Sequence, residues 1–242
     1  MTSELTTYDV DDNAVALLRL DRPEARNALN TAMLNELIEH VGNARSAEEV
    51  RVLVLSSTDQ MGLSAGADVR EEMDREAAEH RMALFARIYD DVTSFPKPTI
   101  AVCHGACVGG GAELAVACDL RVGGANLRLR FPGAAMGIPV GPARLVSLAG
   151  LSVAKYLLLT GKEVAADEAL RWGLVHRVAP AARTEEAALT LAAQVAANEP
   201  EAVARLKRLL HEWDGVEQRS RAEGEGQVEW QRSNQGFEKH DG

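Results

Sequence analysis

Three consecutive glycines, Gly109 to Gly111, restrict the local fold of this chain more than any other stretch of its sequence. An apolar segment typical of a β-strand, residues 99–103, comes shortly before them, and an Ala- and Leu-rich segment typical of a helix follows. Because glycine has no Cβ atom, another molecule can approach the backbone N–H groups of such a corner closely. The positive end of the helix dipole lies at the same corner, so the stretch is suited to hold a negatively charged oxygen.

Glu113 lies in the first turn of the helix that follows the glycines. It could act there as a catalytic acid or base, but a carboxylate at this position is also favoured by the helix dipole alone. The glycines lack the Lys-Ser/Thr pair of a phosphate-binding loop, and their spacing does not match the dinucleotide-binding fingerprint. Taken alone, the stretch is consistent with a functional site and with tight packing to the same degree.

The overall composition argues against several other classes of protein. With 242 residues the chain is long enough for one large domain, or for one domain with an appendage. Its net charge of −10 argues against binding to nucleic acid or to an anionic membrane. The cysteines Cys103, Cys107 and Cys118 are expected to be buried thiols without a disulfide. We find no metal-ligand spacing, no signal sequence and no apolar run of membrane-spanning length, so we expect a soluble cytoplasmic protein without a metal site.

The hydrophobic periodicity predicts an α/β fold, in which strands and helices alternate over the first 140 residues as in repeated right-handed βαβ units. Strands are expected at residues 4–10, 14–20, 50–55, 99–103, 120–122, 127–131 and 174–178. Helices are expected from Asn30 or Thr31 onward, at residues 68–94, after the glycines, at 141–149, 152–160 and 165–172, and twice within 184–213. Residues 216–242 are polar and highly charged.

A second turn of small residues, 64–68, lies between the strand at 50–55 and the next helix, in the same layout as the glycine corner. In a parallel sheet such turns gather at the carboxyl ends of the strands, where ligands bind. One backbone N–H group from each turn could therefore converge on a single oxygen. This arrangement is an oxyanion hole, in which each donor contributes on the order of 3–4 kcal/mol to catalysis.

The same region also contains a G-x-S-x-G pattern, residues 62–66, which is the motif of the nucleophile elbow in serine hydrolases. That motif requires the serine to follow a strand immediately, with an acid and then a histidine downstream. Six residues, 56–61, separate the end of the expected strand from Gly62, and the downstream histidines lie in helical or terminal segments. A serine hydrolase that uses Ser64 therefore remains an alternative supported by the motif alone.

At this point the sequence resembles a known family, the enoyl-CoA hydratase/isomerase or crotonase superfamily. Four segments carry the resemblance, in the same order and at suitable spacing: residues 20–29, 64–68, 105–119 and 166–178. The resemblance implies an α/β fold with a crotonase-like spiral of ββα units over residues 1–180. It further implies a C-terminal helical region over residues 181–242, shortened relative to the family, that serves oligomerisation or covers the site. Members of the family form homotrimers and hexamers (dimers of trimers), so we expect the same here.

The resemblance also assigns roles to individual residues. It places the two oxyanion-hole N–H groups on Ala65 and Gly110, with Glu113 as the catalytic carboxylate, and an acyl-CoA thioester as the substrate. Coenzyme A is then part of the substrate, and no further cofactor is implied. Contacts with the substrate or with its CoA moiety are implied for Ala25, Arg26, Ser64, Gly66, Ala67, Asp68, Gly109 and Gly133.

One departure from the family concerns the reaction itself. Hydratases of the family use two glutamates, and Gly133 occupies the position of the second one. Val140 stands where several relatives carry an acid or a tyrosine. We therefore expect an enoyl-CoA hydratase with one catalytic carboxylate. The alternatives are a divergent member with other enolate chemistry (isomerase, hydrolase or decarboxylase) or a protein that only binds CoA.

Other polar residues near the two turns are assigned mainly structural roles. Glu71, Glu72 and Asp74 could supply a second acid, but they are also typical of a solvated helix start. Asp68 is expected to cap the helix that follows it, and Asp119 and His104 are expected to serve packing. Near the C-terminus, Phe237 and Lys239 are weak candidates for contacts with CoA.

Overall fold

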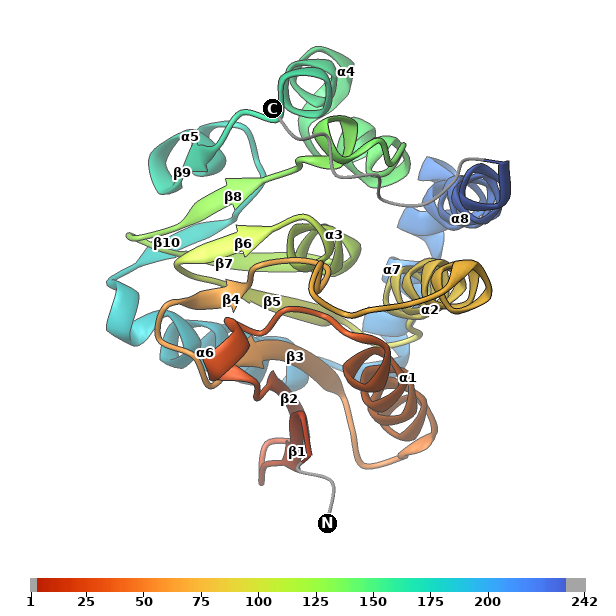
Figure 1. Cartoon of the computed structure of the whole chain (residues 1–242). Coiled ribbons are helices and arrows are strands. Elements are labelled where there is room, and N and C mark those ends of the chain that lie inside the picture. Colours follow the sequence, from red (N-terminus) through yellow and green to blue (C-terminus); the bar gives the residue numbers. More distant parts are fainter. Residues whose placement is uncertain (1–3, 234–242) are drawn as a thin grey trace.

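The computed structural model describes residues 4–233, and their strands form two sheets (Figure 1). The larger sheet contains, in spatial order, β1 (Thr6–Val10), β2 (Val15–Leu20), β3 (Val52–Ser57), β5 (Thr99–Cys103), β7 (Leu120–Gly124) and β10 (Arg177–Ala179). The smaller sheet contains β4 (Gly62–Ser64), β6 (Ala106–Val108), β8 (Arg128–Arg130) and β9 (Val164–Ala165). Only the β1–β2 hairpin and the β8–β9 pair are antiparallel among these ladders.

The helices surround the sheets on both sides. They are α1 (Thr31–Ser46), α2 (Arg75–Thr93), α3 (Gly110–Ala117), α4 (Pro142–Thr160), α5 (Ala166–Arg171), α6 (Thr184–Ala196), α7 (Pro200–Asp214) and α8 (Val216–Ser233). Short 3-10 turns are η1 (Pro23–Ala25), η2 (Gly133–Met136) and η3 (Ala181–Arg183). Asn30 is the N-cap of α1, as predicted, because its side chain accepts a hydrogen bond from the Met33 N–H at 2.9 Å.

From β3 to β8, consecutive strands alternate between the two sheets. The chain passes from β3 to β4 and then into α2, from β5 to β6 and then into α3, and from β7 to β8 before α4. Each pass is one ββα unit, and the units stack through parallel pairing of β3 with β5, β5 with β7, β4 with β6, and β6 with β8. The predicted α/β spiral of ββα units is therefore confirmed.

Both faces of the larger sheet are buried, which explains the nearly continuous apolar runs of its strands. Along β2, Leu18 faces the side covered by α1, whereas Val15 and Leu17 face α6. Helix α6 covers that second face (Figure 1), and its Ala188 and Ala192 are fully buried against the sheet. The predicted boundary at residue 180 falls between β10 and α6; α6 packs on the sheet, and the division into two regions stays a prediction.

Asp119 joins the start of β7 to β5 and to helix α7. Its carboxylate accepts hydrogen bonds from the Thr99 N–H at 2.7 Å, from the Lys207 ammonium at 2.7 Å and from the His211 ring at 3.2 Å. Burial raises the pKa of Asp119, but the hydrogen bonds from His211 and Lys207 outweigh this, so its pKa lies below the ordinary value. The expected structural role of Asp119 is confirmed, and its partners could not be read from the helix-to-strand corner alone.

We expect Asp119→Asn to lower the free energy of unfolding by about 3 kcal/mol, because it leaves the Lys207 ammonium buried without a counter-charge. Urea denaturation at pH 7 measures this difference. Since the ionised form stabilises the native state, the gap between variant and wild type should close as the pH falls below about 4. Glu212→Gln, an exposed change on α7, is the control. Equal stability of the two variants at pH 7 would contradict the assigned role.

Helix α4 is the one helix in residues 4–233 that is long and apolar enough to cross a membrane by length and composition. Its backbone is broken at Gly150, which has φ 76° and ψ 159°, so two shorter helices meet there. These two helices match the prediction of separate helices at 141–149 and 152–160. The broken backbone and the buried Arg144 in its first turn identify α4 as a pair of packed helices in this fold.

The structure differs from the sequence prediction at three places near the site. The short strands β4 and β6 were missed, because three-residue strands carry too little periodicity to be recognised. Helix α2 begins at Arg75 with Asp74 as its cap, so Asp68 is not the cap that was expected. Residues 216–233 form α8, a helix that polar composition alone did not reveal. Phe237 and Lys239 lie outside the described residues.

Candidate active site

The two predicted turns lie side by side because β4 and β6 are parallel neighbours. Gly62 pairs with Ala106 and Ser64 with Cys107, so the turns that follow both strands leave the same edge of the smaller sheet. Gly66 has φ +96°, and a Cβ atom there would lie 2.9 Å from the Val108 carbonyl oxygen and 3.4 Å from the Gly110 nitrogen. Only glycine fits this close approach of two backbones. The predicted convergence of the turns is confirmed, although on the smaller sheet.

The predicted donor Ala65 is wrong. Its N–H donates to the Arg26 carbonyl at 3.0 Å and is therefore not available to a ligand. Two residues after Ala65 lies Ala67, and Leu29 pairs with both of its neighbours: the Leu29 N–H donates to the Gly66 carbonyl at 2.8 Å, and the Leu29 carbonyl accepts from the Asp68 N–H at 2.9 Å. This bridge directs the N–H of Ala67 to the opposite side, where it has no hydrogen-bond partner among residues 4–233.

Gly110 supplies the second free donor. It is the first residue of α3, so its N–H has no partner within the helix. Gly109 before it adopts φ 50° and lets the chain turn from β6 into the helix. Ala67 and Gly110 both line one cavity, which makes Ala67 and Gly110 the oxyanion-hole pair that this structure favours.

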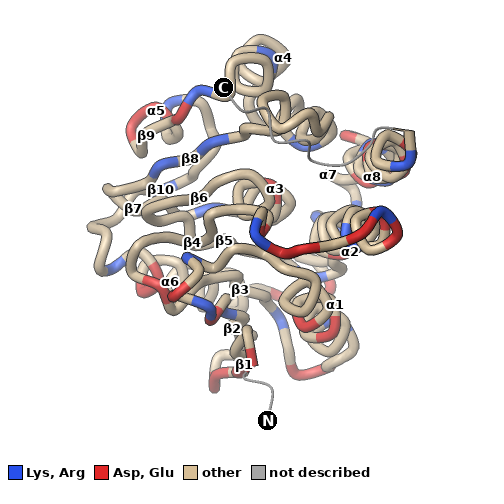
Figure 2. Tube along the Cα trace, viewed as in Figure 1, with Lys and Arg blue, Asp and Glu red and all other residues tan. Residues whose placement is uncertain are grey.

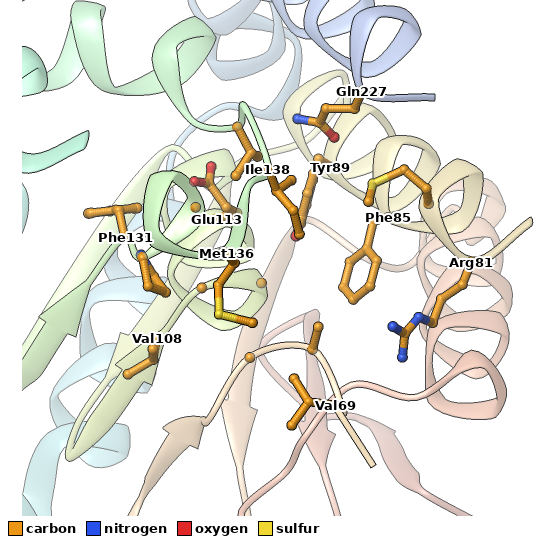
Figure 3. Close-up of a pocket in the computed structure, with 18 of the residues that line it drawn as sticks. Val69, Arg81, Phe85, Tyr89, Val108, Glu113, Phe131, Met136, Ile138 and Gln227 are labelled. Carbon is orange, nitrogen blue, oxygen red and sulfur yellow. The ribbon is translucent and has the colours of Figure 1, made fainter. Parts of the chain in front are cut away.

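The cavity beside these donors has a volume of about 300 Å³ and a mostly apolar wall. Its apolar residues come from α2, from the segment before it, and from the segment between β8 and α4: Val69, Met82, Phe85, Phe131, Met136 and Ile138. Figure 3 shows five of these side chains, those of Val69, Phe85, Phe131, Met136 and Ile138, around an open centre, with the Arg81 guanidinium and the Gln227 amide at its border. Such a cavity suits an apolar chain whose polar end meets the two N–H groups.

Glu113 also lines the cavity, and its side chain is only 1% exposed. One oxygen, Oε2, accepts hydrogen bonds from Arg144 at 2.8 and 3.3 Å, whereas Oε1 has no partner within the described part of the chain. The pKa of Glu113 is raised from 4.5 to about 7, mainly because burial disfavours the charged form. Arg144 opposes this rise and Glu223 adds to it. A carboxyl group with such a pKa can both accept and donate a proton near neutral pH.

Arg144 and Glu223 were not anticipated from the sequence. Arg144, in the first turn of α4, is 2% exposed, and its Nη2 atom lies 2.6 Å from Glu223 of α8 and 2.8 Å from Glu113. Glu223 in turn accepts hydrogen bonds from the Gly141 and Ala143 N–H groups at the start of α4. The only signal in the sequence for the position of Glu223 was the spacing of Glu and Gln in residues 216–233. This spacing is uninformative until the segment is known to be a helix.

The residues predicted to contact the substrate or CoA fall into two groups. Gly66, Ala67, Gly109 and Gly133 line the cavity, whereas Ala25, Arg26, Ser64 and Asp68 do not. Asp68 instead pairs with Arg22 at 2.6 Å, and Arg26 is exposed next to the turn at residues 64–68. Contacts of all these residues with CoA stay predictions.

Ser64 is not a nucleophile in this structure. Its side chain is 1% exposed, and its hydroxyl donates to the Asn27 carbonyl at 2.7 Å and accepts from the Gly66 N–H at 3.1 Å. Among residues 4–233, no histidine contacts it. The hydroxyl therefore shapes the turn, and the serine hydrolase alternative is wrong.

Gly133 begins the η2 turn and lines the cavity. A Cβ atom there would lie 2.6 Å from the Ile138 carbonyl oxygen and 2.9 Å from Val140. A glutamate at this position therefore requires the loop before α4 to move. The local backbone, as well as the sequence, therefore excludes a carboxylate side chain at position 133.

The acidic residues before α2 do not replace that second carboxylate. Figure 2 shows acidic positions along the segment that leads into α2. Glu71 accepts from the Thr31 N–H at the start of α1 and pairs with Arg81 at 3.0 Å. Asp74 caps α2, and Glu72 is exposed. Two other predictions of packing hold: His104 is buried with its ring nitrogen 2.9 Å from the Asp59 carbonyl, and the three cysteines are buried thiols.

Residues 4–233 contain no group of three His, Cys, Asp or Glu side chains placed to hold a metal ion. The cavity itself offers two free backbone donors and one acid–base group beside an apolar wall.

Comparison with known proteins assigns this arrangement to a family. A family model described as enoyl-CoA hydratase/isomerase matches residues 11–235. The chain belongs to the enoyl-CoA hydratase/isomerase family. It is 33% identical over 205 residues to a short-chain-enoyl-CoA hydratase of Clostridium acetobutylicum, covering 83% of this chain and 78% of that protein. It is 36% identical over 205 residues to the 2,3-dehydroadipyl-CoA hydratase of Escherichia coli, covering 82% and 78%.

A solved structure shows the same fold. The crystal structure of an enoyl-CoA hydratase from Bacillus anthracis superposes with a TM-score of 0.84 at 30% identity, covering 94% of this chain and 90% of that one. The protein is thus an enzyme of the enoyl-CoA hydratase/isomerase family with a crotonase fold, as the resemblance of the four sequence segments predicted.

The assignment of the donor to Ala67 can be tested by replacing single N–H groups with ester oxygens. Lactic acid incorporated at position 67 keeps the side chain and removes the free N–H. We expect kcat for an enoyl-CoA substrate to fall about 10²–10³-fold, as for other lost oxyanion-hole donors. The matched control is the same replacement at position 65, which should lower the melting temperature and leave most of the activity. A larger loss of kcat at position 65 than at position 67 would restore Ala65 as the donor.

Proposed function

We propose that the protein catalyses the addition of water to a 2-enoyl-CoA thioester, with Glu113 as the only catalytic carboxylate. The observation that carries the proposal is the position of Glu113: a buried carboxyl group with one unpartnered oxygen, on the cavity that the free N–H groups of Ala67 and Gly110 also line. The relatives named enoyl-CoA hydratase support the same reaction. We propose no cofactor, because coenzyme A is part of the substrate.

The chemistry needs only the groups already described. The thioester oxygen accepts hydrogen bonds from Ala67 and Gly110, which stabilise the negative charge of the enolate as it forms. Ionised Glu113 takes a proton from water while the water oxygen bonds to the β-carbon. Protonated Glu113 then returns that proton to the α-carbon, which restores the thioester and the free carboxylate. One group thus performs both proton transfers.

This mechanism predicts a dependence on the ionisation of Glu113. We expect Glu113→Gln to lower kcat for crotonyl-CoA hydration by about 10²–10⁴-fold, because the amide cannot accept the water proton. Loss of the absorbance of the conjugated thioester measures the rate. Since the free enzyme must hold Glu113 ionised, kcat/KM of the wild type should rise with pH through about 7.

Binding serves as the control for this variant. Calorimetry with crotonyl-CoA should give a similar affinity for Glu113→Gln and for the wild type, because the amide is nearly isosteric. Free CoA should bind more weakly than the thioester, because it lacks the carbonyl oxygen. Unchanged kcat in Glu113→Gln would refute the proposed reaction, and equal affinity for CoA and crotonyl-CoA would refute the oxyanion hole.

We also propose that the protein assembles as a homotrimer or as a hexamer of two trimers, as the family resemblance implies. The second half of α4 supports self-association, because Leu151 is 57% and Leu159 76% exposed on its surface. Leu159→Glu should lower the mass measured by light scattering toward that of a single chain. Val10→Glu, a partly exposed change on β1, should leave the mass unchanged. A wild-type mass of 26 kDa would refute the assembly.

A further inference from the structure

Helix α8 reaches the active site through one buried ion-pair cluster, which we define as Glu113, Arg144 and Glu223. The three residues come from α3, α4 and α8, and their side chains are 1%, 2% and 9% exposed. A single atom, Nη2 of Arg144, contacts both carboxylates, at 2.8 Å to Glu113 and 2.6 Å to Glu223. The cluster therefore links the acid–base group of the proposed reaction to a helix that contributes no backbone to the oxyanion hole.

Arg144 holds the two oxygens of Glu113 unequally. Its Nε and Nη2 atoms both donate to Oε2, at 3.3 and 2.8 Å, and Oε1 keeps no partner in residues 4–233. A guanidinium commonly binds both oxygens of a carboxylate side by side. Here its other contacts prevent this, since Nη1 donates to Ser220 of α8 and Nη2 is shared with Glu223. One oxygen of Glu113 is thus anchored, and the other is left for a proton.

Glu223 fixes the position of Arg144 from the other side. Its Oε2 accepts a hydrogen bond from the Ala143 N–H at 2.7 Å, and its Oε1 accepts from the Gly141 N–H at 3.2 Å. These N–H groups belong to the start of α4 and would otherwise lack partners. The carboxylate therefore caps the very helix that carries Arg144. Gly141 leaves room for the cluster, because a Cβ atom there would lie 2.7 Å from Oε1 of Glu113.

The charges around Glu113 come from several elements. Arg144 of α4 and Glu223 of α8 belong to the cluster. The guanidinium carbon of Arg144 lies over the ring of Tyr89 from α2, at 5.0 Å from the centre of that ring. Burial keeps Tyr89 neutral by raising its pKa well above the ordinary value. The cavity wall adds Arg81 of α2 and Arg130 of β8. Within the cluster, one cation serves two carboxylates, so the charge of Glu223 disfavours ionisation of Glu113.

We propose that Arg144 and Glu223 form a positioning pair that holds Glu113 for proton transfer, so that helix α8 is a required part of the active site. The proposal rests on the proposed function for its kinetic readout. Arg144 and Glu223 touch neither the substrate nor the reacting atoms, and act only through the orientation and ionisation of Glu113.

The first test is Glu223→Gln, which removes one charge and keeps an amide oxygen for the N–H groups of α4. We expect the midpoint of the kcat/KM profile for crotonyl-CoA to move to lower pH by roughly one unit, because a negative charge near Glu113 is lost. KM should change little, because Glu223 does not line the cavity. Glu225→Gln is the matched control: it removes the same charge from the exposed side of α8 and should leave the profile unchanged.

The second test separates geometry from charge. Arg144→Lys keeps the positive charge. Lysine, however, has a single side-chain nitrogen, whereas the guanidinium uses three nitrogens for its contacts. We expect kcat to fall about tenfold or more at constant KM, as expected when a catalytic group is displaced. Wild-type kcat in Arg144→Lys, or an unshifted profile in Glu223→Gln, would overturn the positioning pair. Because folding can also fail, circular dichroism accompanies both variants, and the result from the folded variant decides.

A measurement that does not depend on turnover keeps this proposal apart from the proposed function. Infrared titration follows the protonated carboxyl band of Glu113, identified by its absence in Glu113→Gln. If the wild type shows no hydration but Glu223→Gln lowers this midpoint, the proposed reaction fails and the positioning pair stands. If hydration is present and the infrared midpoint is the same in both proteins, the positioning pair fails and the proposed reaction stands.

Discussion

The parallel pairing of β4 with β6 is the constraint on which the active site depends. These strands are only three residues long, and each is followed by a turn of small residues. Their pairing places Gly66 in backbone contact with the glycine corner, at distances that exclude any Cβ atom. Both free N–H groups, those of Ala67 and Gly110, then lie at one cavity. A displacement of either strand would separate the donors, so the larger sheet and its covering helices serve to hold this pairing in register.

Burial of charge is the second determinant of the site. Removing Glu113 from water raises its pKa to about 7, and Arg144 prevents a further rise. A buried ion pair of this kind contributes little net stability, because desolvation offsets much of the attraction between the charges. Its value in this protein is functional: the cluster provides one carboxyl group that changes protonation near neutral pH. Glu113 shares the cavity wall with Gly133 and with apolar side chains, so the wall offers no second carboxylate at position 133.

Much of the fold could be predicted because its signals are local. The β1–β2 hairpin, the Asn30 cap, and the break that divides α4 follow from turn residues, cap residues and glycine, and each was found where expected. The strands β4 and β6 could not, because short strands have no distinct periodicity. The polar helix α8 likewise left no periodic signal, and only the family resemblance implied a helical region over these residues. Asp68 was wrongly predicted to cap α2. Both Asp68 and Asp74 could cap a helix by residue type, and only the path of the backbone shows that the helix begins after Asp74.

The sequence by itself determined the two turns, the position of Glu113 beside one of them, and the absence of a carboxylate at Gly133. These features depend on residue type and short-range order, and they sufficed to indicate the family. The tertiary structure decided which N–H groups are free. Leu29 forms hydrogen bonds with the residues on both sides of Ala67, and the Arg26 carbonyl accepts a hydrogen bond from the Ala65 N–H. It also decided the surroundings of Glu113, since Arg144 lies 31 positions from Glu113 and 79 from Glu223. Contacts over such separations arise only when distant helices pack together, which no local pattern specifies.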